Sequence, residues 1–207
     1  MPRVRVHQHV NPLSPYYRQE PKPVDLVEVF ADPRLPLHLD IGCARGRFLL
    51  KMAAEQPGWN YLGVEIREPL VDEANRLAKE AGLENLHYVF CNAMLWLDRL
   101  LSSVPDKILQ TVTIQFPDPW FKNKHAKRRM VNRELVDMIS KHLASEAEVF
   151  VQTDISRLAD EMFLQFRISD FYEERSVELN PFPIKTEREI AVETKGLPIY
   201  RRLFVKK

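Results

Sequence analysis

Residues 37–46 read LHLDIGCARG, and this stretch decides the fold class. Residues 37–41 predict a short buried strand, with Asp40 near its end and a turn containing Gly42 and Gly46 directly after it. Glycines in such a strand-to-helix turn let the backbone approach a ligand closely. Ala44 stands where a dinucleotide-binding fingerprint needs glycine, so the turn is not that motif. By itself the turn is weak evidence, because ordinary tight turns also contain glycines at such positions.

Outward from this turn, strand-like and helix-like segments alternate. The expected strands are residues 37–41, 60–66, 86–91, 109–116 and 148–153. The expected helices are residues 45–56, 69–81 and 94–101, one after Asn132, and one that Ser156 caps. Two further strand-like runs, 171–179 and 199–205, follow with no helix expected between them. The pattern predicts an α/β fold with a mostly parallel seven-stranded sheet, an antiparallel edge and helices on both faces.

Composition is that of an ordinary soluble protein. The chain has 207 residues, of which 45% are hydrophobic and 29% charged, with a net charge of +1. We expect a cytoplasmic protein, because no apolar run is long enough to span a bilayer and residues 1–10 have no signal-peptide core. The two cysteines, Cys43 and Cys91, have no partner at metal-ligand spacing, so no metal site is expected.

The chain divides into residues 1–35 and residues 36–207. The first part is rich in proline and carries basic side chains, among them Arg3, Arg5 and Arg18. We expect an extended or partly disordered arm there, either without a role or ordering on RNA. Residues 36–207 form the expected catalytic domain.

Four polar residues stand where expected strands end. Asp40 ends the first strand, Glu65 the second, and Asn92 and Asp118 follow the third and fourth. Ligands of open α/β sheets bind beyond the carboxyl ends of the strands. A carboxylate at the position of Glu65 suits hydrogen bonds to two ribose hydroxyls. Asn92, followed by Ala93, suits either the edge of an adenine or a helix N-cap.

The stretch 115–129, QFPDPWFKNKHAKRR, carries the most specific signal. Two prolines hold Asp118 on a stiff loop, and Trp120 and Phe121 offer rings on which a base can stack. The Lys/Arg/His run that follows is either a solvated surface or, more consistently with its neighbours, a phosphate-binding segment.

Two further segments belong to the same predicted edge of the sheet. Asp154 follows the fifth strand, where it either serves a substrate or caps the next helix. Residues 186–189, TERE, are either part of the site or a helix-capping box.

This sequence resembles the bacterial tRNA (guanine-N7)-methyltransferases. The resemblance covers nearly all of the chain after Leu35 and is carried, in order, by DIGCARGRFL, YLGVEI, CNA, QFPDPWFKNKHAKRR, VQTD and TEREIAVETKGLPIYR. It implies a Rossmann-like class I methyltransferase fold, S-adenosylmethionine as cofactor, and methylation of guanine 46 in the variable loop of tRNA. It leaves a monomer or a homodimer open.

The resemblance also implies roles for individual residues. Cofactor-binding positions would be Asp40, Gly42, Gly46, Glu65, Asn92, Ala93 and Asp118. Asp118 would also be the catalytic residue, and substrate-binding positions would be Lys122, Asp154, Thr186, Glu187, Arg188 and Glu189. This chain departs from the common family pattern at Asn92, Phe121, Asn123 and Ala126.

Other functions fit fewer of these residues. A methyltransferase acting on a protein or small molecule leaves the basic run unused. A non-catalytic RNA-binding subunit leaves Asp40, Glu65 and Asp118 without a task. A nicotinamide-dependent oxidoreductase conflicts with Ala44. The sequence therefore favours the tRNA methyltransferase.

Overall fold

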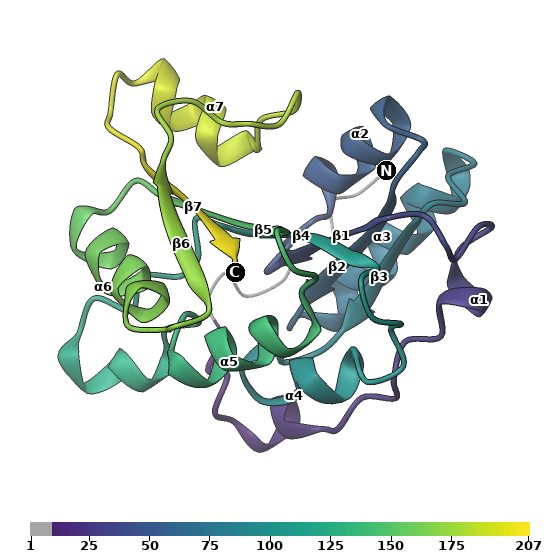
Figure 1. The fold of residues 1–207 in the computed structure, drawn as a ribbon, viewed down its shortest axis with the longest axis horizontal. Coiled ribbons are helices and arrows are strands. Elements are labelled where there is room, and N and C mark those ends of the chain that lie inside the picture. The colour runs from purple at the N-terminus through teal and green to yellow at the C-terminus, as the bar shows by residue number, and fades with distance from the viewer. Residues whose placement is uncertain (1–9) are drawn as a thin grey trace.

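A computed structural model describes residues 10–207, which form one seven-stranded sheet (Figure 1). The strand order is β3-β2-β1-β4-β5-β7-β6. The strands are β1 (Leu37–Ile41), β2 (Asn60–Glu65), β3 (Leu86–Phe90), β4 (Leu109–Gln115), β5 (Glu148–Thr153), β6 (Tyr172–Ser176) and β7 (Tyr200–Lys206). Strands β1 to β5 are parallel, and β7 runs antiparallel to both β5 and β6. The mostly parallel sheet with an antiparallel edge is thus confirmed.

Helices cover both faces of this sheet, as predicted. They are η1 (Pro15–Arg18), α1 (Leu26–Val29), α2 (Arg47–Glu55), α3 (Glu68–Glu80), α4 (Ala93–Leu100), η2 (Asn123–Arg128), α5 (Arg133–His142), α6 (Ser156–Arg167) and α7 (Glu187–Thr194). Apolar side chains of α2 and α3 form one core cluster. Those of α4, α5 and α6 form a larger one with the central strands. No described helix is long and apolar enough to cross a membrane.

Two details of the expected helices are wrong. Helix α7 lies between β6 and β7, where no helix was expected. It begins because the Thr186 hydroxyl accepts a hydrogen bond from the Glu189 amide at 3.1 Å, which is the first half of a capping box. Ser156 is the first residue of α6 rather than its cap, which is Ile155.

The N-terminal segment packs against the sheet domain over its described part, residues 10–35. Val24, Leu26 and Phe30 join the larger core cluster, and Asp25 caps the short helix α1. This differs from a wholly extended arm, because these apolar residues lie between the prolines that dominate the composition. Arg3 and Arg5 lie outside the described residues, and the division of the chain at residue 35 stays a prediction.

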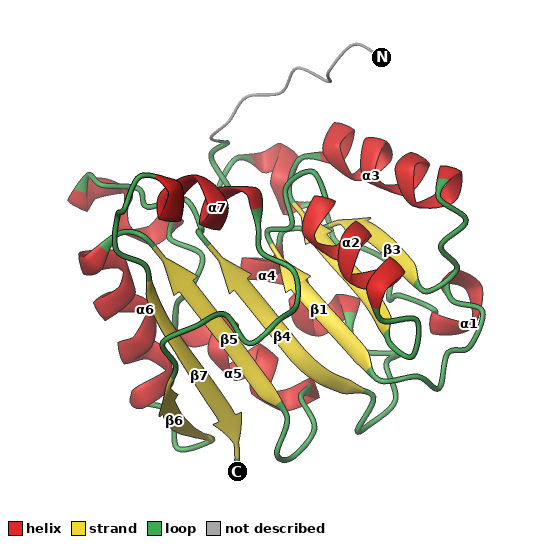
Figure 2. Cartoon of the chain, turned by 90° about the horizontal axis from the view of Figure 1, so that it is seen from above, coloured by secondary structure: helices red, strands yellow, loops and turns green. Residues whose placement is uncertain are grey.

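The carboxyl ends of the parallel strands all lie at one end of the sheet. In Figure 2 the arrowheads of β4 and β5 point toward α7, whereas β7 runs the opposite way to the C-terminus. The strand-end residues predicted from the sequence therefore share one edge of the molecule.

Candidate functional site

A cavity of about 1410 Å³ opens at the carboxyl ends of the parallel strands. Its walls combine several acidic and basic side chains with three exposed or partly exposed rings, those of Phe116, Trp120 and Phe121. The charged residues are Asp40, Glu65, Asp118, Asp154, Glu187, Arg45, Arg47, Arg67, Arg128 and Arg188. The cavity thus joins the predicted cofactor end, at β1 and β2, with the predicted substrate end, at the loop after β4.

Asp40 lines the cavity and is almost fully buried. It stands opposite Thr113 in the β1–β4 register, and the Thr113 hydroxyl donates to Asp40 Oδ1 at 2.7 Å. Thr113 Oγ1 lies 3.1 Å from Nε2 of the buried His38. Burial raises the pKa of Asp40 to about 6, against the opposing effect of hydrogen bonding. Burial likewise lowers the pKa of His38 to about 3, so the ring is neutral.

Glu65 uses both carboxylate oxygens within the protein. Oε1 accepts from the backbone amide of Arg67 at 3.0 Å and from its Nε at 2.9 Å. Oε2 accepts from the amide of Ala44 at 3.0 Å and from Arg67 Nη2 at 3.0 Å. Burial lowers the pKa of the Arg67 guanidinium, but the hydrogen bond and charge of Glu65, together with the charge of Asp118, raise it overall. Arg67 therefore carries a positive charge between two of the predicted site carboxylates.

Only one of the two glycines of the turn lines the cavity. Gly42 lines it with φ at 82°, whereas Gly46 does not line it. A Cβ on Gly46 would lie 2.5 Å from the Tyr88 ring, whose hydroxyl donates to the Gly46 carbonyl at 2.6 Å. Gly46 is thus needed for packing and for its φ of 69° rather than for direct approach to a ligand. Ala44 also has a positive φ, 51°, and presents its amide to Glu65.

Asn92 and Ala93 line the cavity at the start of α4. Asn92 occupies the N-cap position, but its side chain makes no capping hydrogen bond. Its amide instead donates to the carbonyls of Pro12 at 2.9 Å and Tyr17 at 3.1 Å. The N-terminal segment is thereby fixed across this end of the cavity, and Pro12 lines the cavity itself.

Asp118 lies on a loop of unusual backbone geometry. Phe116 and Trp120 on either side have φ values of 50° and 41°, a region that residues other than glycine rarely adopt. Arg129 holds the loop from behind, since its guanidinium donates to the carbonyls of Pro119 and Trp120 at 3.2 Å each. Such strain, held by specific contacts, is typical of functional loops. Asp118 lines the cavity.

The rings beside Asp118 differ in exposure. Phe121 is 72% exposed at the mouth of the cavity. Trp120 also lines the cavity and is packed by Arg128, whose guanidinium carbon lies 4.9 Å from the ring centroid, and by His125. Phe121 thus presents a surface for stacking, whereas part of the Trp120 surface is already in use.

The basic run after these rings separates into two groups. Arg129 pairs with Glu161, and Arg133 pairs with Asp137, so these two serve the protein structure. Lys122, Lys124 and Lys127 are exposed next to the cavity, although they do not line it. The exposed lysines, rather than the whole run, are the candidates for phosphate contacts.

Residues 186–189 are only partly in the cavity. Thr186, Glu187 and Arg188 line it, with Glu187 paired to Arg47 and Arg188 paired to Asp154. Asp154 also lines the cavity, and it does not cap α6, whose N-cap is Ile155. Glu189 points away from the cavity and is fully buried.

The sequence did not single out Arg45, Arg47 or Arg67, which supply cationic groups to the cavity wall. Arg67 directly follows the second strand, as EIR, and the Glu65–Arg67 spacing was the one available signal. Arg45 and Arg47 flank Gly46 in the turn and are paired with Glu73 and Glu187 across the fold. Such long-range pairs leave no mark in the local sequence.

Comparisons with known proteins agree with this geometry. A family described as "Putative methyltransferase" matches residues 34–202. A tRNA (guanine-N(7)-)-methyltransferase of Synechococcus elongatus is 54% identical over 209 residues, covering 100% of this chain and 98% of that protein. One of Trichormus variabilis is 51% identical, covering 99% and 97%.

Solved structures similar to this one confirm the Rossmann-like methyltransferase fold. A precorrin-6y C5,15-methyltransferase from Geobacter metallireducens has a TM-score of 0.57 at 15% identity, covering 88% of this chain and 84% of its own. An rRNA methylase from Streptococcus thermophilus has a TM-score of 0.54 at 12% identity, covering 87% and 91%. Taken with the sequence matches over the full length, these findings show that the chain belongs to the tRNA (guanine-N(7)-)-methyltransferase family.

Proposed function

We propose that this protein methylates N7 of guanine 46 in the variable loop of tRNA, with S-adenosylmethionine as methyl donor. The observation that carries the proposal is the shared cavity. Its walls include Asp40 and Glu65 at the strand ends, together with Asp118 and Phe121 on the strained loop that precedes the exposed lysines. A small-molecule methyltransferase would have no use for those lysines.

The polar groups of the cavity suit S-adenosylmethionine. Glu65 ends β2, where a carboxylate can bind ribose hydroxyls once Arg67 gives up some of its hydrogen bonds. Gln115 lines the cavity, and its side-chain Nε2 offers a donor to a ligand. The remaining contacts to the cofactor would come from Asp40, Gly42 and Ala93, and from the N-terminal segment that Asn92 holds at the cavity. When bound, S-adenosylmethionine supplies an electrophilic methyl group.

The protein's own contribution is mainly positioning. Guanine N7 carries an in-plane lone pair and no proton, so its methylation requires no general base. Holding N7 in line with the methyl group accounts for most of the expected acceleration. The purine gains positive charge as it is methylated, and the Asp118 carboxylate would favour that charge. Asp118 or Asp154 would also match the N1–H and N2–H₂ donors of guanine, and the exposed Phe121 ring would stack on a base turned into the cavity.

Methyl transfer from labelled S-adenosylmethionine to a tRNA transcript tests the proposal. We expect label in tRNA, with chain cleavage specific for N7-methylguanine mapping it to guanine 46, and loss of label when guanine 46 is replaced by adenine. Label at another guanine would contradict the position. Label only in protein or in small molecules would contradict tRNA as the substrate.

A further inference from the structure

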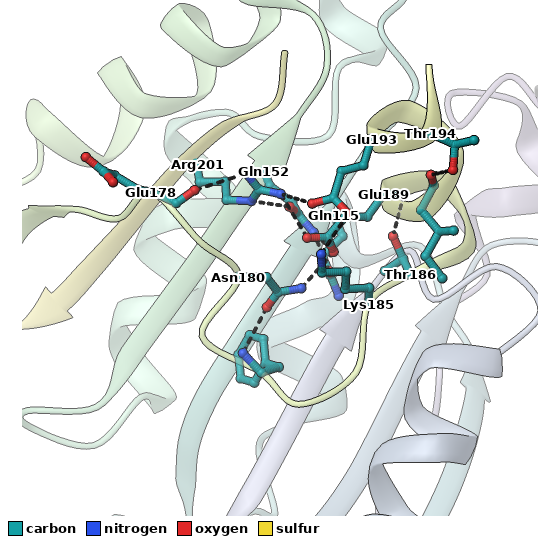
Figure 3. A network of polar contacts seen from close by, with 12 residues as sticks. Gln115, Gln152, Glu178, Asn180, Lys185, Thr186, Glu189, Glu193, Thr194 and Arg201 are labelled. Atoms are coloured by element: carbon teal, nitrogen blue, oxygen red, sulfur yellow. Dashed lines mark hydrogen bonds and ion pairs between the residues drawn. The ribbon is translucent and has the colours of Figure 1, made fainter. Parts of the chain in front are cut away.

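Glu189 is the one residue of the TERE segment that has no exposed surface. Its carboxylate is satisfied inside the protein, as Figure 3 shows. Oε1 accepts from Arg201 Nη2 at 2.9 Å, and Oε2 accepts from Asn180 Nδ2 at 2.7 Å and Gln152 Nε2 at 3.1 Å. A carboxylate with three internal donors and no exposed surface cannot reach an RNA base without unpacking the protein.

Arg201 completes this buried cluster from β7. Its Nε donates to Gln152 Oε1 at 3.2 Å and its Nη1 to the Glu178 carbonyl at 3.2 Å. Nη2 also lies 3.3 Å from Glu193 on α7. The cluster therefore ties together β5, β7, the loop that precedes α7, and α7 itself (Figure 3). Because a buried ion pair tolerates little displacement of either partner, it fixes the position of α7 on the sheet.

The start of α7 depends directly on this anchor. The Glu189 backbone amide donates to Thr186 Oγ1, so the residue that holds the cluster also holds the helix cap. Thr186, which is the cap, and Glu187 and Arg188, which lie between it and Glu189, line the cavity. Fixing Glu189 therefore fixes the cavity-lining residues that precede it.

The cluster also extends to the wall of the cavity on the cofactor side. Gln152 Nε2 donates to Gln115 Oε1 at 2.8 Å. Gln115 lines the cavity, and its amide group acts on Asp40 closely enough to lower the pKa of that carboxyl. A row of hydrogen-bonded side chains thus runs from Gln115 on β4, through Gln152 on β5, to Glu189 at the base of α7.

We infer that Glu189 is a positioning residue, which acts through Arg201 and Gln152 to hold the start of α7 at the substrate end of the cavity, and that it does not contact tRNA. The inference rests on the proposed function for its kinetic part. It replaces the direct substrate-binding role that the family resemblance implied for Glu189, while Thr186, Glu187 and Arg188 keep theirs.

A double-mutant cycle tests the inference with Glu189→Gln, Arg201→Gln and the double variant. Each single change leaves one buried partner uncompensated, so we expect kcat/KM for tRNA to fall on the order of 10- to 100-fold, mainly through a higher KM. The double variant removes both charges, and we expect its kcat/KM to be no lower than that of the less active single variant. Multiplying effects in the double variant would show that Glu189 acts independently of Arg201 and would overturn the inference.

Hydrogen exchange over α7 supplies a second readout that needs no activity. Both single variants should speed exchange in residues 187–194 while leaving β1 unchanged, and unchanged exchange in Arg201→Gln would also overturn the inference. Glu174→Gln is the matched control, because Glu174 pairs with Arg202 at the same sheet edge outside the cavity. If the wild-type protein failed to methylate tRNA, the proposed function would fail, and the exchange cycle would still decide the role of Glu189.

Discussion

The Arg67 guanidinium donates hydrogen bonds to both oxygens of the Glu65 carboxylate, from Nε to Oε1 at 2.9 Å and from Nη2 to Oε2 at 3.0 Å. With the two backbone amides that also donate to it, Glu65 has no acceptor position left for an added ligand. Ribose hydroxyls can therefore bind there only in exchange for part of this pairing. Cofactor binding and the position of Arg67 are then linked.

Glu65→Gln should weaken cofactor binding. The amide keeps the shape of the side chain but loses the charged acceptor that hydroxyl groups prefer, which corresponds to roughly 10- to 100-fold in Kd. Isothermal calorimetry with S-adenosylhomocysteine measures this directly. Glu73→Gln, which breaks only the pair with Arg45, is the control for removing one carboxylate near the turn. An unchanged Kd in Glu65→Gln would contradict a role for Glu65 in ribose binding.

Asp118→Ala should reduce methyl transfer by at least about 100-fold, because a carboxylate positioned at developing charge is worth that much in comparable sites. The protein should stay folded, since the loop backbone is held by Arg129 rather than by the Asp118 side chain alone. Turnover and the thermal midpoint are measured side by side, with the surface variant Asp137→Asn as control. Near-normal turnover in Asp118→Ala would remove it from the reaction centre.

Asp40 should make stability depend on pH. Its folded pKa, about 6, lies above the ordinary value of 3.8, so the folded state holds the proton more tightly. The resulting stabilisation is present below about pH 4 and is lost as the pH rises through 6; it amounts to roughly 3 kcal/mol. Denaturant unfolding of wild type and Asp40→Asn between pH 4 and 8 measures most of this change. A difference between the two that does not change with pH would contradict the raised pKa.

The exposed lysines should govern the salt dependence of tRNA binding. Lys122→Ser and Lys124→Ser should each lower the slope of log Kd against log salt by about 1, because each lost phosphate contact releases fewer counterions. Cofactor affinity should not change. Lys79→Ser, at the end of α3 farthest from the cavity mouth, is the control. Equal slopes for all variants would exclude this segment from the tRNA contact.

Asn92→Ala should loosen the N-terminal segment without unfolding the domain. The variant loses the hydrogen bonds to the Pro12 and Tyr17 carbonyls, which corresponds to exchange roughly 10-fold faster in residues 13–17. Mass spectrometry of the exchanged peptides measures it, and peptides of β4 report on the domain. Unaltered exchange in residues 13–17 would mean that Tyr16, which donates to Glu68, and the Trp96 contact suffice to hold the segment.

The sequence predicted the parallel sheet and the residues at its strand ends, because hydrophobic periodicity and strand termini are local properties. It missed α7, since that helix has a weak apolar stripe in which Ile190 is exposed and Val192 buried. The orientations of the Asn92 and Glu189 side chains were also beyond its reach, since the first donates to the Pro12 carbonyl and the second pairs with Arg201. Contacts between distant parts of the chain decide such orientations, and no local pattern encodes them.

The two ends of the described chain lie at opposite ends of the parallel strands. Val10 lines the cavity, whereas β7 carries Lys207 to the edge at which the parallel strands begin. A fluorophore, affinity handle or surface tether attached behind Lys207 would thus leave the mouth of the cavity clear. Immobilised binding assays with whole tRNA should accordingly be built from the carboxyl terminus.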